Sequence, residues 1–135
     1  MDIFIKMCNC PDIQGIWEPS AWDYCFCKKD NEVVVLSGYE TDAGFYGHSI
    51  TFDCGETLSE FKGRHIWLPT QSQLQGMVLG SDLPDEFCKV IGYFYDFVLS
   101  VTPQFDSMEQ LWLAFVRKVK YGKIWSGEEW ENEGR

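Results

Sequence analysis

The chain has 135 residues, 45% of them hydrophobic and 16% aromatic, and its 21 acidic and 11 basic residues give a net charge of −10. This composition excludes a disordered chain, and the length favours a single domain with its own core. The acidic balance argues against binding to nucleic acid or to an anionic membrane, because phosphate contacts need clustered basic side chains. It suits a partner protein, including a basic one.

The first ten residues contain one lysine and no long apolar run, so they do not have the pattern of a secretory signal peptide. No segment approaches the ~20 consecutive apolar residues that a membrane-spanning helix needs. We therefore expect a cytoplasmic protein with no membrane partner. In that reducing compartment the six cysteines would remain thiols.

The first half of the chain predicts strands and loops. Residues 1–20 are interpreted as an N-terminal arm, and residues 21–69 as mainly strands and loops. A polar turn at 28–32 joins an alternating strand to a β-branched strand that ends at Gly38, so the two form a hairpin. Further strands are predicted at 45–54 and 65–69. The alternation in the first strand places Trp22, Tyr24 and Phe26 on one face and Asp23, Cys25 and Cys27 on the other.

The second half, residues 70–122, predicts mainly helices. Thr70 and Gln73 fit a capping box, Asp82 can cap a second helix that ends before Pro103, and Ser107 can cap a third that stops at Gly122. Residues 123–135 are interpreted as a short strand or turn followed by an acidic tail. The predicted fold is therefore a single α+β domain, 1–135, in which a small antiparallel sheet packs on two or three helices. The apolar stripe predicted for the second helix consists of Phe87, Val90, Ile91, Phe94, Phe97, Val98 and Val101.

Two Cys-x-Cys pairs in the first half suggest a zinc site, formed by Cys8, Cys10, Cys25 and Cys27. Residues two apart on a strand lie about 6.7 Å apart, whereas sulfurs on one zinc ion lie about 3.8 Å apart. The chain would therefore have to bend at the first pair, and His48, Cys54 or His65 could complete the site. The alternative is that the cysteines are reduced thiols that pack as small hydrophobic side chains. No other cofactor is expected.

Catalytic motifs are scarce. The only histidines are His48 and His65, and a Cys-His pair such as Cys54 with either of them would be a nucleophile and base combination. The plentiful carboxylates are interpreted as solvated, and Asp96, which lies beside an apolar stripe, as a structural acid. No phosphate-binding loop is present. The sequence assigns no catalytic residue, so an enzyme is only an alternative hypothesis.

A resemblance covers about half of the chain. Residues 66–78 contain Trp-Leu-Pro-Thr-Gln, and residues 107–130 end in Lys-Tyr-Gly-Lys-x-Trp-x-Gly-Glu-Glu-Trp. Both stretches are similar to a family of small uncharacterised proteins that bacteria and their prophages encode. The resemblance implies a prophage or mobile-element context and brings no activity, cofactor or catalytic residue with it.

The favoured hypothesis is a non-catalytic, acidic accessory protein of phage or prophage type that acts by binding another protein. Aromatic residues among polar ones are typical anchors of such interfaces. The alternatives are the zinc-binding module and a small enzyme with a Cys/His site. A basic cluster at residues 117–123 is better explained as a helix C-terminus than as a nucleic-acid site, because an acidic run follows it. The predicted partner-binding residues are Tyr39, Tyr46, Tyr121, Lys123, Trp125 and Trp130.

Overall fold

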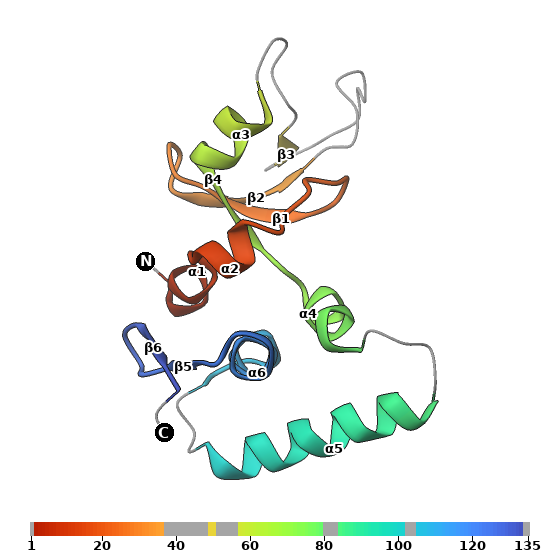
Figure 1. Cartoon of the computed structure of the whole chain (residues 1–135). Coiled ribbons are helices and arrows are strands. Elements are labelled where there is room, and N and C mark those ends of the chain that lie inside the picture. Colours follow the sequence, from red (N-terminus) through yellow and green to blue (C-terminus); the bar gives the residue numbers. More distant parts are fainter. Residues whose placement is uncertain (1, 37–48, 51–56, 80–83, 102–104, 134–135) are drawn as a thin grey trace. The chain divides into compact units, whose positions relative to one another are not determined.

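The computed structural model describes residues 2–36, 49–50, 57–79, 84–101 and 105–133 (Figure 1). The chain forms two compact units, Met1–Pro69 and Thr70–Arg135. Their boundary coincides with the predicted change from strands to helices. The first unit contains the sheet and the second contains the long helices, so the predicted α+β class is confirmed.

The sheet of the first unit has the order β3-β2-β1-β4. Strand β1 (Tyr24–Cys27) pairs antiparallel with β2 (Glu32–Leu36) and with β4 (His65–Leu68). The predicted hairpin is confirmed, and Asn31 in its turn has a φ of 56°, which asparagine tolerates better than most residues. Strand β3 (Ser49–Ile50) pairs with β2 in parallel, so this part of the sheet is not antiparallel. The rest of the strand predicted at 45–54 lies outside the described residues.

Three short helices in the first unit correct the sequence interpretation, which assigned an arm and loops to these segments. They are α1 (Ile3–Cys8), α2 (Pro11–Gln14) and α3 (Leu58–Arg64). The Asp2 side chain accepts a hydrogen bond from the Phe4 amide, and the Thr57 hydroxyl accepts one from the Glu60 amide. Helices this short have little apolar periodicity of their own and depend on tertiary packing. Each buries residues in the unit, among them Met7, Ile13 and Phe61.

The side-chain amide of Gln14 completes the outer edge of β4. Its Nε2 donates to the carbonyls of Trp67 (3.0 Å) and Cys8 (2.9 Å), and its Oε1 accepts from the Trp67 amide (2.8 Å). Strand β4 lies at the edge of the sheet. Because unpaired backbone groups at an edge must find partners, Gln14 replaces one residue of a missing strand.

We predict that Gln14→Ala destabilises the first unit by about 1–3 kcal/mol, the cost of leaving part-buried backbone groups of Trp67 and Cys8 without partners. Thermal unfolding measures the loss, and hydrogen exchange locates it, because the Trp67 amide should exchange faster. The control is Gln75→Ala, which removes a glutamine side chain from the second unit and should leave the Trp67 exchange rate unchanged. An unchanged Trp67 exchange rate in Gln14→Ala would contradict the role of the amide.

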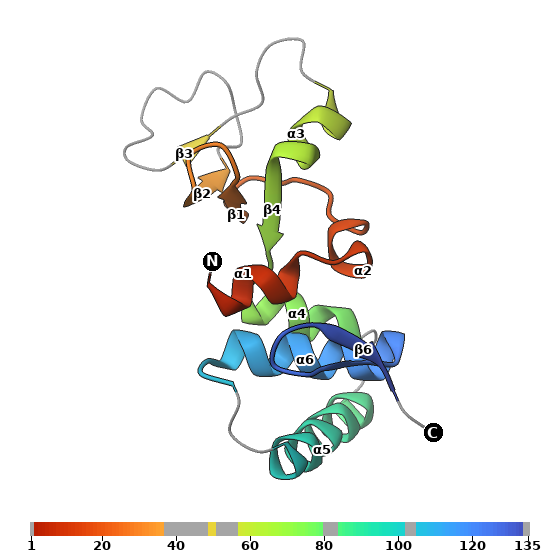
Figure 2. The same cartoon turned by 90° about the vertical axis from the view of Figure 1, so that its left-hand side faces the viewer.

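The helices of the second unit are α4 (Gln71–Val78), α5 (Pro84–Ser100) and α6 (Met108–Tyr121). The predicted capping box of Thr70 and Gln73 is present, and the Ser107 hydroxyl accepts from the Gln110 amide. Gly122 ends α6 with a φ of 63°, a left-handed conformation that glycine adopts without strain. Asp82, the cap predicted for α5, lies outside the described residues. In both Figures 1 and 2, α6 lies between α4 and α5.

A C-terminal hairpin packs on α6. It consists of β5 (Lys123–Trp125) and β6 (Trp130–Asn132), paired antiparallel. The indoles of Trp125 and Trp130 meet edge to face, with centroids 5.1 Å apart, and the Arg117 guanidinium lies 4.5 Å from the centre of the Trp130 ring. Residues of the closing Lys-Tyr-Gly-Lys-Ile-Trp motif therefore pack within this unit.

Candidate functional site

The four cysteines of the predicted zinc site are all buried. Burial, reinforced by Cys10, raises the pKa of Cys8 well above its ordinary value. Burial, with smaller contributions from Cys27 and Asp23, raises the pKa of Cys25 to about 12. Metal ligands and nucleophiles must be thiolates, and these environments favour the protonated thiol.

The structure does not gather the two cysteine pairs into a metal centre. Among the described residues, no three His, Cys, Asp or Glu side chains are placed to hold a metal ion. The first pair has the bend that the sequence interpretation required, because the Cys10 amide donates to the Cys8 carbonyl (2.8 Å). The second pair lies along β1. His48 and Cys54 lie outside the described residues, so the zinc site remains a prediction without support from the described geometry.

His65 is a buried residue that ties α3 to β4. Its Nδ1 lies 2.8 Å from the Phe61 carbonyl oxygen, and its ring stacks on the Phe61 ring with centroids 4.3 Å apart. Burial lowers the pKa of His65 from its ordinary value of 6.5, although the Phe61 carbonyl acts in the opposite direction. These contacts describe a structural histidine. The predicted pairing with Cys54 lies outside the described residues.

The lowered pKa of His65 predicts an acid-sensitive stability. Well above the ordinary pKa of 6.5, both the folded and the unfolded chain hold this histidine neutral, and it has no effect on stability. As the pH falls from there, the unfolded chain binds a proton first, so the free energy of unfolding decreases. Denaturant unfolding from about pH 7 to about pH 5 should therefore show a steeper loss for the wild type than for His65→Asn, which can still donate to Phe61. Parallel curves would contradict this role.

The predicted partner-binding residues are only partly on the surface. Trp125 is 4% exposed, so it is not available as the anchor that the sequence suggested; the reason is its packing against Trp130. Tyr121, Lys123 and Trp130 are half-buried, and the Lys123 ammonium donates to the Asn132 side chain. Their role in partner binding remains a prediction. Tyr39 and Tyr46 lie outside the described residues.

Helix α5 attaches to α6 through two phenylalanines. The Phe94 ring stacks on Trp112, with centroids 3.8 Å apart and planes within 7°, and meets Phe115 edge to face at 5.3 Å. Phe97 packs on Phe115 at 5.6 Å and is buried. These contacts cover one side of α5, because a helix can bury only one stripe against a single neighbour.

Other large apolar side chains of α5 are exposed. Residues at four-residue spacing form a continuous row, which we call the α5 ridge: Phe87, Ile91, Tyr95 and Leu99. Tyr95 is 63% exposed and Leu99 67%. Phe87 and Ile91 belong to the apolar stripe that the sequence predicts for this helix, but both side chains are exposed. The exposed apolar area of the ridge is on the order of 400 Å², the size of the largest apolar patches on monomeric proteins, which are often functional.

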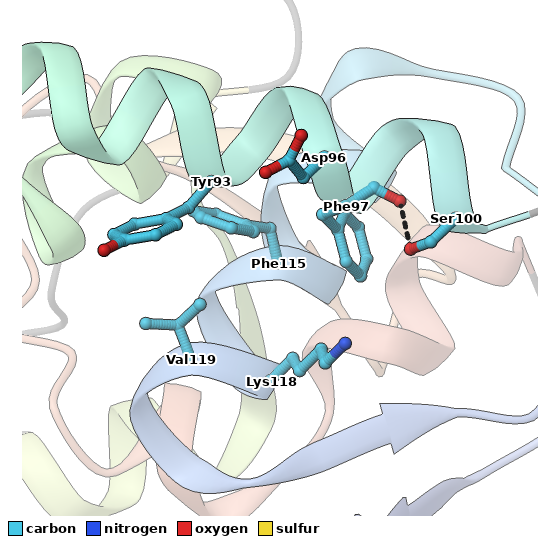
Figure 3. A pocket seen from close by; sticks show the side chains of 7 residues that line it. All are labelled: Tyr93, Asp96, Phe97, Ser100, Phe115, Lys118 and Val119. Atoms are coloured by element: carbon cyan, nitrogen blue, oxygen red, sulfur yellow. Dashed lines mark hydrogen bonds between the residues drawn. The ribbon is translucent and has the colours of Figure 1, made fainter.

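A pocket of about 390 Å³ lies between α5 and α6 (Figure 3). Its walls include the rings of Phe97 and Phe115, and the Lys118 ammonium lies 5.7 Å from the centre of the Phe97 ring. The Ser100 hydroxyl is engaged, since it donates to the Phe97 carbonyl (2.9 Å). The full lining is Tyr93, Asp96, Phe97, Ser100, Phe115, Lys118 and Val119. Nothing in the sequence identified this pocket, because it depends on how two helices pack.

No family model matches the chain, and the searches found no similar curated protein or solved structure. Of the helices that the structure describes, none is both long enough and apolar enough to cross a membrane. The function is therefore argued from the residues of this chain.

Proposed function

We propose that this chain is a non-catalytic, acidic accessory protein of phage or prophage type that acts in the cytoplasm by binding another protein. The observation that carries the proposal is the α5 ridge, a row of large apolar side chains that the fold leaves exposed. The candidate catalytic and metal-binding residues within the described ranges are buried thiols and a structural histidine, which supports a binding role. The phage context rests on the resemblance of the two sequence motifs.

The partner that best fits the ridge is a basic amphipathic helix. A row at four-residue spacing on one helix is the surface that packs into the groove of another helix. The net charge of −10 attracts a basic partner and speeds its association. The same charge opposes a second copy of this chain, because two acidic molecules repel each other.

A defined probe tests this proposal: a synthetic helix of about 18 leucine and lysine residues with helical periodicity. Isothermal titration should show that it binds more tightly than a glutamate analogue or a scrambled sequence of the same composition. The double variant Tyr95→Gln/Leu99→Gln should bind it at least about tenfold more weakly, since two exposed side chains no longer become buried. Its unfolding temperature should stay near that of the wild type, because those side chains are exposed.

The matched control is Leu58→Gln, which removes an exposed leucine from α3, outside the ridge, and should bind like the wild type. Equal affinity of the ridge double variant and the wild type would contradict the proposal. Sedimentation provides the second arm. A dimer of the wild type that the double variant loses would assign the ridge to self-association instead.

A further inference from the structure

The pocket between α5 and α6 already holds one cation. The Lys118 ammonium lies 5.7 Å from the centre of the Phe97 ring, a distance at which the ring attracts positive charge. Phe97 and Phe115 are buried, but Tyr93 at the mouth is 63% exposed, so its ring can still accept a planar group. The pocket therefore combines buried aromatic walls with an open aromatic face.

A carboxylate also borders this pocket. Asp96 lies on α5 at the rim of the pocket; in Figure 3 its exposed carboxylate stands above the rings of Tyr93 and Phe97. Within the residues that the structure describes, this carboxylate makes no hydrogen bond or ion pair, since Lys118 lies over Phe97 instead. It can accept hydrogen bonds from a ligand without breaking an existing contact.

We propose that this pocket takes an arginine side chain of the basic partner, an inference that rests on the proposed function. The guanidinium would stack on Tyr93 and donate to Asp96, with its methylene stem against Val119. Arginine fits better than lysine because a guanidinium is planar and weakly hydrated. Its face can stack on Tyr93 while the N–H groups at its edge donate to Asp96. The volume of about 390 Å³ is within the range of ligand pockets and exceeds what one such side chain fills.

The test replaces each lysine of the leucine and lysine helix by arginine in turn, and compares the tightest binder with its neutral citrulline counterpart. Arginine should bind about fivefold more tightly than citrulline, the combined effect of stacking and one exposed ion pair. Asp96→Asn should reduce this advantage to less than about twofold. Glu86→Gln is the matched control, because it removes an exposed α5 carboxylate that does not line the pocket, and should leave the advantage unchanged.

Replacing Lys118 should change the affinity for the arginine peptide in the opposite direction. Lys118→Gln removes the resident cation, so the arginine peptide should bind a few times more tightly. If Asp96→Asn still binds the arginine peptide about fivefold more tightly than the citrulline peptide, the pocket proposal is overturned. The ridge proposal would stand, because Tyr95→Gln/Leu99→Gln tests it separately.

A second arm does not depend on the ridge. N-acetylarginine amide, titrated alone into the full chain, should shift the NMR signals of the Tyr93 and Phe97 rings in a saturable manner, with half-saturation at a few-fold lower concentration in the wild type than in Asp96→Asn. That result supports the pocket even where no peptide binds the ridge. Identical titration curves in wild type and Asp96→Asn would overturn it.

Discussion

Stacking between Phe94 and Trp112 determines which side of α5 is left exposed. The two ring centroids lie 3.8 Å apart with nearly parallel planes, and Phe115 meets Phe94 edge to face, so α5 can rotate little on α6. With Phe94 and Phe97 turned inward, Tyr95 and Leu99 lie on the outward side of α5 and are exposed. The exposure of this C-terminal part of the ridge is thus a consequence of one aromatic cluster. Two rings of this cluster, Phe97 and Phe115, also line the pocket between the two helices.

The C-terminal motif that first suggests a binding surface instead contributes to packing. Trp125 is buried, and Trp130 packs against both Trp125 and the Arg117 guanidinium. A short hairpin is only marginally stable by itself. Here a cation and two indoles hold it against a helix. Aromatic residues among polar ones have the same sequence pattern in a core and at an interface, so only burial distinguishes the two. In the second unit, some aromatic side chains therefore pack in the interior, and others lie on the exposed α5 ridge or, like Tyr93, at the mouth of the pocket.

Local signals in the sequence predicted those elements whose capping and periodicity are strong. The Thr70 capping box, the Ser107 cap and the Gly122 stop are all present, as is the hairpin that turns at Asn31. The short helices α1, α2 and α3 were missed because tertiary packing, not periodicity, stabilises them. Most of the candidate site could not be predicted from the sequence. The amphipathic stripe of α5 was recognised, but the part of it that α6 covers depends on how the two helices pack. Asp96 was singled out as a structural acid, and its exposure beside a pocket became visible only in three dimensions.

The central claim is that α5 is the surface that a partner helix covers, and hydrogen exchange tests it most directly. The full chain is compared with and without a saturating amount of the leucine and lysine helix. The amides of α5 should exchange more slowly in the complex, because a bound helix stabilises α5, and those of β1 and β2 should not change. Protection at the exposed Trp22 and Tyr24 with none in α5 would contradict the claim and move the interaction surface to the first unit.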